Sequence, residues 1–203
     1  MNTNTKKNII LYPAVTSSYP NYRNPNPSLD ELSYLTQIVD SIHAALTEST
    51  KHTPFITISK LTSPVEKAIP QLDDLTQDTS PSSNLIIGVG LNVSRQDGRI
   101  HTPHGWSIIN SPDNPESDNL ASCLTAAAIA SLGQRPSSSI TCSGSQKFIN
   151  QMPILNVSAR PAVLTLNLYQ DNRRDAAYLL SSAGRRAIIN LHVKGILTYL
   201  EST

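Results

Sequence analysis

The sequence is poor in cysteine, in blocks of like charge and in long apolar runs, and each shortage excludes a class of protein. Its two cysteines, Cys123 and Cys142, are too few for a disulfide framework or a cysteine zinc site, so we expect inert thiols. The 16 basic and 15 acidic residues give a net charge of +1, with no long block of either sign. The sequence thus has no concentration of positive charge that would bind nucleic acid or an anionic membrane, and we expect neither as a partner.

No apolar segment is long enough to cross a membrane, so we expect no membrane insertion. The first apolar segment, residues 8–13, is also too short for the core of a signal peptide. These features predict a soluble protein without a signal peptide. The 203 residues suit a single domain spanning 1–203, which is long enough to bury a substantial core.

Helical patterns alternate with short apolar segments along the chain. One apolar stripe at helical spacing predicts a helix from Ser28 or Asp30 to about Glu48. The residues of this stripe are Leu32, Leu35, Val39, Ile42 and Leu46. Further helices are expected at 119–132, 172–181 and 184–200, with a short one at 65–72. The expected strands are 8–13, 55–60, 85–93, 105–110 and 161–169, with a short one at 139–142.

Two of the expected strands, 85–93 and 161–169, are almost continuously apolar. Such a run is typical of a strand that is covered on both faces of a parallel sheet, so we predict that these two lie together in the core. The order of strands and helices predicts an α/β fold, a three-layer sandwich with a mostly parallel sheet. Ligands of such sheets bind beyond the carboxyl ends of the strands, and these ends are mostly apolar here.

Residues 161–200 resemble the last third of a family of hydrolases. The strand opens Pro-Ala-Val-Leu at 161–164, Tyr169 follows, and Asn172 with Asp175 forms an Asn-x-x-Asp step before a helix that ends Gly-Ile-x-x-Tyr-Leu at 195–200. This pattern is similar to that of the zinc-dependent N-acetylmuramoyl-L-alanine amidases, which hydrolyse peptidoglycan. The resemblance extends in matching order through residues 105–110 and the earlier apolar strands, and it implies an amidase-like fold.

The resemblance also implies where the zinc site of the family would lie. The first zinc histidine of the family follows the first strand in an Asp-x-Gly-His-Gly turn, and Val15 stands at that position. The second lies in Ser-x-His-x-Asn, which corresponds to GVGLN and places Gly90 at the histidine. Leu166 replaces the catalytic glutamate, and only the middle ligand, a glutamate that opens the first helix, has a counterpart, in Asp30 or Glu31.

This set lacks the side chains that the chemistry of the family needs. A catalytic zinc requires about three protein ligands and an open position for water. A missing general base costs a further factor of ~10²–10⁴ in rate. We therefore expect a degenerate site at Val15, Glu31, Gly90 and Leu166, with no catalytic residue, no metal and no cofactor.

A relocated metal site is the alternative. His101 and His104 lie three positions apart in the loop before residues 105–110, and Asp97 or Glu31 would complete the ligand set. An exposed polar loop with incidental histidines is the simpler interpretation. No Gly-x-Ser-x-Gly elbow supplies another nucleophile.

Two functions remain open. The first is a catalytically inactive, amidase-like protein that serves as a structural or binding component of an assembly, for example a phage virion, and is cytoplasmic or virion-associated. It would contact itself or other assembly proteins through loops 16–28 and 94–104, where Tyr19, Tyr22 and Arg23 lie in the first loop, and it would retain an affinity for peptidoglycan fragments. The second is an active N-acetylmuramoyl-L-alanine amidase that hydrolyses peptidoglycan with displaced ligands.

Overall fold

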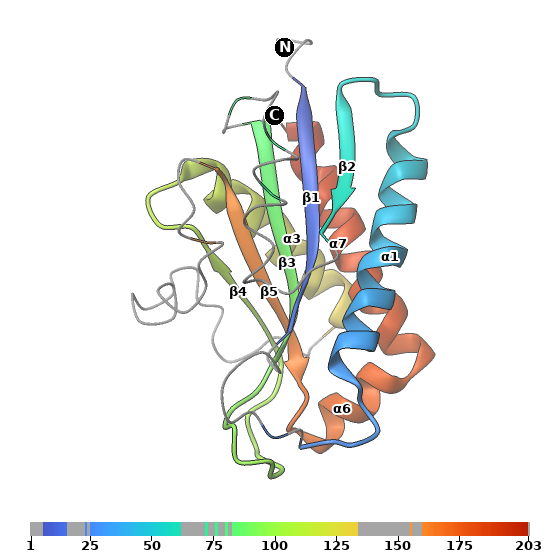
Figure 1. The fold of residues 1–203 in the computed structure, drawn as a ribbon, viewed down its shortest axis with the longest axis vertical. Helices are drawn as coiled ribbons and strands as arrows, with labels where there is room; N and C mark the ends of the chain where they lie inside the picture. Colours follow the sequence, from blue (N-terminus) through green and yellow to red (C-terminus); the bar gives the residue numbers. More distant parts are fainter. Residues whose placement is uncertain are drawn as a thin grey trace.

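A five-stranded sheet forms the centre of the protein, in the strand order β2-β1-β3-β5-β4 (Figure 1). The computed structural model describes residues 6–15, 23, 25–61, 72, 76, 80, 83–133, 155 and 160–202. The strands are β1 Lys7–Ala14, β2 Ile56–Lys60, β3 Asn84–Asn92, β4 Trp106–Asn110 and β5 Ala162–Tyr169. All neighbouring strands are parallel except β4 and β5, which are antiparallel. The predicted α/β fold with a mostly parallel sheet is confirmed.

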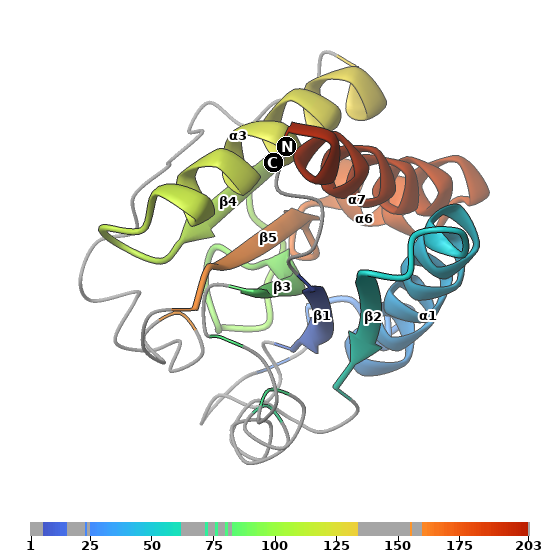
Figure 2. The same cartoon turned by 90° about the horizontal axis from the view of Figure 1, so that it is seen from above.

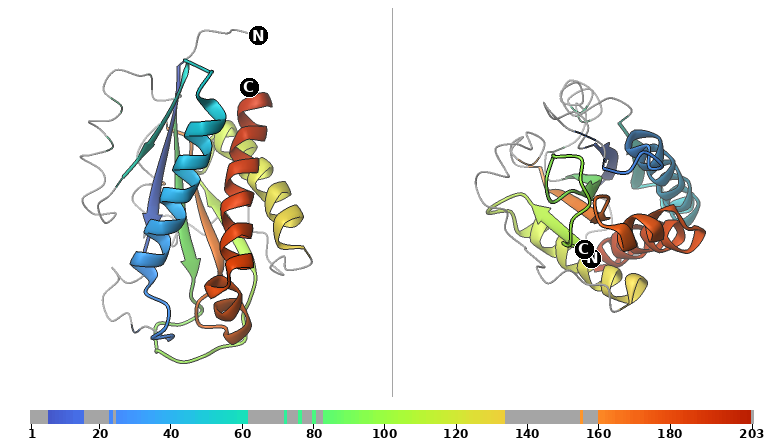
Figure 3. Two further views of the ribbon diagram at one scale, coloured as in Figure 1. Left: turned by 90° about the vertical axis from the view of Figure 1, so that its right-hand side faces the viewer. Right: turned by 90° about the horizontal axis from the view of Figure 1, so that it is seen from below.

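Three long helices cover one face of this sheet, as the view from above shows (Figure 2). The described helices are α1 Glu31–Thr50, α3 Pro115–Leu132, α6 Arg173–Leu180 and α7 Ser182–Ser202. In the left view of Figure 3, α1, α7 and α3 lie side by side in front of the strands. None of the helices in the described residues has the length and apolar composition that a membrane crossing needs.

Two sequence expectations about these helices were wrong. Helix α3 begins at Pro115 rather than at 119, because Asn114 caps it by accepting a hydrogen bond from the Ser117 amide at 3.1 Å. Leu32, expected in the apolar stripe of α1, is 51% exposed. The first turn of α1 instead buries Glu31 and Tyr34, so the intervening Leu32 lies about 100° around the helix, toward solvent.

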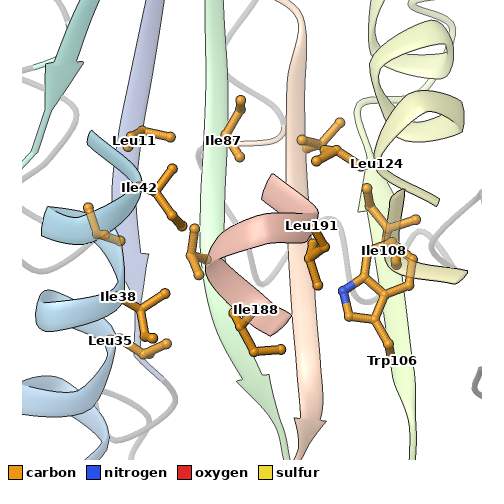
Figure 4. Packing of buried hydrophobic residues seen from close by; sticks show 14 of the residues in the cluster. Leu11, Leu35, Ile38, Ile42, Ile87, Trp106, Ile108, Leu124, Ile188 and Leu191 are labelled. Atoms are coloured by element: carbon orange, nitrogen blue, oxygen red, sulfur yellow. The ribbon is translucent and has the colours of Figure 1, made fainter. Parts of the chain in front are cut away.

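The main core lies between the sheet and the three long helices (Figure 4). There, Ile87 of β3 packs among side chains such as Ile42 of α1 and Leu191 of α7. Strands β3 and β5 pair in parallel, with Ile87 opposite Val163, and both Ile87 and Leu164 are fully buried. The prediction that these two strands lie together in the core is confirmed.

The opposite face of the sheet is also covered. Its side chains include Ile10, Ile86 and Leu164, which are fully buried and form a second cluster with Leu72 and Leu155. The helix expected at 65–72 falls outside the described residues except for Leu72, and the strand expected at 139–142 lies outside them entirely. Burial on both faces is what a three-layer arrangement requires.

Candidate functional site

The carboxyl ends of β1, β3 and β5 meet at one edge of the sheet, the lower edge in Figure 1. In the strand register Ala14 lies opposite Gly90, and Gly90 lies opposite Leu166. Val15 follows Ala14 directly and is buried, whereas Leu166 is half-buried. The three positions that the amidase resemblance assigns to two zinc ligands and the catalytic acid are therefore neighbours on adjacent strands.

Gly90 lies where the backbones of β1 and β5 approach β3 closely. A Cβ atom at this position would lie 2.8 Å from the Ala14 carbonyl oxygen and 3.4 Å from the Ala14 Cβ. The pairing of β3 with β5 is irregular between Gly90 and Asn92. Because backbone atoms cannot move aside as a flexible side chain can, this site accepts a larger residue only if the strands shift.

The two acidic residues at the start of α1 have different environments. Asp30 is exposed and caps the helix, since its Oδ1 accepts a hydrogen bond from the Ser33 amide at 3.2 Å. Glu31 is buried, and its Oε1 accepts a hydrogen bond from Gln170 Nε2 at 3.1 Å. Glu31 is thus the one acidic group at a family position that is turned into the protein, and Gln170, at the end of β5, was not anticipated from the sequence.

These residues do not fit a catalytic zinc. Val15 and Leu166 carry hydrocarbon side chains and Gly90 carries none, so none of the three has a donor atom for a metal. One carboxylate, Glu31, remains, and one of its oxygens already accepts the bond from Gln170.

The alternative ligands His101 and His104 lie on the loop between β3 and β4. His101 Nε2 is 2.9 Å from Asp97 Oδ1, and this hydrogen bond is the main reason why the pKa of Asp97 lies below its usual range. His104 is exposed, with its Nδ1 3.3 Å from the Thr102 carbonyl oxygen. Across the described residues, no group of three or more His, Cys, Asp or Glu side chains is placed to hold a metal. The structure brings Asp97 to His101, but neither His104 nor Glu31 completes a set.

The same loop is held from inside by two buried carboxylates that follow β5. Asp171 Oδ2 accepts hydrogen bonds from the Ser94 amide at 2.8 Å, from the Ser94 hydroxyl and from the Arg95 amide at 3.4 Å. Asp175 Oδ2 accepts from the Gly105 amide at 2.7 Å and from the Tyr169 amide at 3.0 Å. Both ends of the loop are therefore fixed to the segment between β5 and α6.

Asn172 connects the middle of the loop to the same segment. Its Oδ1 accepts from the Arg174 and Asp175 amides and so caps α6, while its Nδ2 donates to the Thr102 carbonyl at 3.1 Å. The Asn-x-x-Asp spacing was visible in the sequence as part of the resemblance. The role of Asp171 was missed, although an Asp-Asn pair before a helix is a recognisable capping signal.

A buried polar chain runs beneath this edge from β4 to α7. Trp106 Nε1 donates to Asn167 Oδ1 at 3.0 Å, and Asn167 Nδ2 donates to Thr165 Oγ1 at 3.1 Å. The Thr165 hydroxyl lies 2.8 Å from His192 Nε2, and His192 Nδ1 lies 2.7 Å from the Ile188 carbonyl oxygen. Since a carbonyl can only accept, Nδ1 carries the proton of the neutral ring. The single Thr165 hydroxyl hydrogen then has two acceptors within reach, His192 Nε2 and the Gly88 carbonyl oxygen at 3.0 Å. Complete burial lowers the pKa of His192 to about 4.

No protein-family model matches this chain, and no curated protein matches it in sequence. Its solved structural neighbours, in contrast, cover nearly its whole length. The N-acetylmuramyl-L-alanine amidase Ami1 from Mycobacterium smegmatis superposes with a TM-score of 0.72 at 16% identity, covering 98% of this chain and 99% of the other. The N-acetylmuramoyl-L-alanine amidase from Clostridium difficile 630 gives 0.71 at 12% identity, with 98% and 100% covered.

A third neighbour is the N-acetylmuramoyl-L-alanine amidase AmiC2 of Nostoc punctiforme, with a TM-score of 0.68, 14% identity, and 98% and 99% of the two chains covered. At such low identity a structural match establishes the fold and leaves the chemistry open. The amidase-like fold expected from the sequence is therefore confirmed: this chain has the fold of the N-acetylmuramoyl-L-alanine amidases.

Proposed function

We propose that the protein is a catalytically inactive member of the amidase fold that acts by binding, as a structural component of an assembly such as a phage virion. One observation carries the proposal. Val15, Gly90 and Leu166 lie on three adjacent strand ends, where the resemblance places two zinc ligands and the catalytic acid, and none of them offers a donor atom.

The physical consequence follows from the donor count. A zinc ion that activates water needs about three protein ligands, and lowering the pKa of that water depends on the ion being held. With leucine at position 166, the position that the resemblance assigns to the general base has no proton acceptor, which costs ~10²–10⁴ in rate. The Ala14 carbonyl oxygen also lies so close to Gly90 that a larger side chain would fit there only if the strands shifted.

A binding role is supported by the loop at the same edge. Residues 94–105 are exposed over much of their length, yet their backbone is fixed by Asp171, Asn172 and Asp175. A fixed loop loses little conformational entropy when it meets a partner, which favours binding. We infer that this loop contacts copies of the chain or other proteins of the assembly, and that peptidoglycan fragments are a further ligand to test.

The test combines metal content with activity. Purified protein should contain well below one zinc per chain and release no peptide from dye-labelled peptidoglycan, while an active amidase assayed in parallel releases it. Stoichiometric zinc that is lost in the His101→Ala/His104→Ala double variant would establish a relocated site and overturn the proposal. Zinc-independent release of peptide would overturn it equally.

A further inference from the structure

Four exposed arginine residues lie on or next to the fixed loop at the carboxyl edge of the sheet, and we call them the arginine rim: Arg23, Arg95, Arg173 and Arg174. Within the part of the chain that the structure describes, none of their guanidinium groups is paired with a carboxylate. A set of unpaired, exposed cations at one edge is available to an anionic partner.

The rim is assembled from three separate segments. The Arg95 amide donates to Asp171 Oδ2 at 3.4 Å, and Asp171 lies two residues before Arg173. The Cβ atom of Arg23 would be 3.1 Å from a Cβ built on Gly98, so Arg23 lies against the same loop. The right view of Figure 3, from below, shows the loop and the start of α6 together at this edge.

Among the described residues, no carboxylate of this region forms an ion pair with a rim arginine. Asp171, Asp175 and Glu31 are buried and accept hydrogen bonds from backbone amides, the Ser94 hydroxyl and the Gln170 amide group. Asp30 and Asp97 are exposed. Asp30 accepts the Ser33 amide at the start of α1, and Asp97 is hydrogen-bonded to His101 and lies close enough to Arg99 for that cation to contribute to its lowered pKa. The N-termini of α1 and α7 lie toward the same edge and add their positive dipole ends.

We propose that the arginine rim docks a carboxylate-rich segment of a protein partner. The inference rests on the proposed function, since it names the kind of partner that the binding protein takes. Arginine binds carboxylates through two parallel hydrogen bonds, a geometry that lysine does not offer. Ile100, on the same loop and 43% exposed, provides the apolar contact that a peptide with mixed side chains uses.

A nucleic acid fits this surface less well. Its affinity comes from many phosphates spread along a backbone, and a chain with a net charge of +1 and no long basic block supplies few contacts beyond the rim. A compact cluster of arginines beside an apolar side chain matches a short acidic protein segment better.

The experiment measures fluorescence anisotropy of a labelled peptide of Glu and Asp with interspersed Leu, added to the full chain at low salt. The rim variant is Arg95→Gln/Arg173→Gln/Arg174→Gln. The matched control, Lys51→Gln/Lys60→Gln/Lys194→Gln, removes the same charge from exposed positions away from the rim. Thermal melts of all three proteins confirm that each is folded.

We expect the wild-type chain to bind the peptide, the rim variant to bind at least about tenfold more weakly, and the control to stay near wild type. An equal loss of peptide affinity in the control variant would show that only the net charge matters, and it would contradict the proposal that the rim is the binding site. Tighter binding of a single-stranded oligonucleotide than of the peptide would overturn the choice of partner. Absence of peptide binding in protein that is free of zinc and inactive would overturn the rim while leaving the proposed function intact.

Discussion

The absence of a Cβ atom at Gly90 allows the strands to pack closely at this edge. The residue is fully enclosed by the backbones of β1 and β5, and the carbonyl of Ala14 fills the space that a side chain would need. Glycine is required here by close approach between strands, and its conformation is an ordinary extended one, since it is not among the positive-φ glycines of the described chain.

Adding one methyl group at this position tests the close contact. We expect Gly90→Ala to lower the free energy of unfolding by about 1–3 kcal/mol, because the new Cβ would be 2.8 Å from the Ala14 oxygen. Urea unfolding followed by circular dichroism measures the change, with exposed Gln96→Ala as the control. An alanine variant as stable as the wild type would show that the strands separate there at no cost.

His192 is a second residue whose environment makes a measurable prediction. Its folded pKa of about 4 lies below the ordinary value of 6.5, so the folded state favours the neutral ring. The contribution of the neutral ring to the stability of the folded state is complete above pH 6.5. It is lost as the pH falls from 6.5 toward 4, because the unfolded chain then binds the proton more readily than the folded chain. The total loss is about 3 kcal/mol.

The matching measurement compares urea unfolding of wild type and His192→Gln between pH 4 and pH 7.5. Glutamine keeps a polar group but cannot take up a proton, so the difference in unfolding free energy between the two proteins should shrink as the pH falls. A difference that stays constant over this range would contradict a buried neutral histidine.

Among the elements, the loop between β3 and β4 depends most on a few side chains. We expect Asp171→Ala to lower the free energy of unfolding by about 1–3 kcal/mol, because the Ser94 and Arg95 amides would lose a buried acceptor. Hydrogen exchange should speed up at Ser94 and Arg95 and leave β1 unchanged. Glu201→Ala, which removes an exposed carboxylate near the end of α7, is the control. Unchanged exchange in the Asp171 variant would mean that the loop is held by other contacts.

Much of the architecture at this scale was predictable, and the exceptions have physical causes. Almost continuous apolar runs identified β3 and β5 and their shared burial, since a strand exposed on one face could not carry them. The start of α3 was missed because Pro115 reads as a loop residue, although proline suits the first helical turn once Asn114 supplies the cap.

The candidate site was likewise predictable in part from the sequence. The positions of Val15, Gly90 and Leu166 came from matching order along the chain. The strand register pairs Gly90 with Leu166 and with Ala14, the residue before Val15. The contact of Glu31 with Gln170, and that of Asp171 with Ser94, join segments far apart in the sequence. No local spacing encodes such contacts, because they depend on how the sheet brings its strand ends together.

For the whole molecule, the proposed role requires contact with other chains. We expect association with copies of itself or with a partner over at least ~1,000 Å². Analytical ultracentrifugation of the purified protein, together with a pulldown from its native particle, measures this. A chain that stays monomeric and captures no partner would contradict the assembly role.

The strand order β2-β1-β3-β5-β4 also bears on how the chain folds while it is being synthesised. Strand β3 is complete long before β5, its neighbour, leaves the ribosome, and β4 is made in between but pairs only with β5. One edge of β3 therefore stays open during translation, and an open apolar edge recruits other strands. Nascent chains truncated before residue 162 should aggregate unless a chaperone covers that edge, so we expect the yield of this protein to depend on how quickly residues 93–169 are translated.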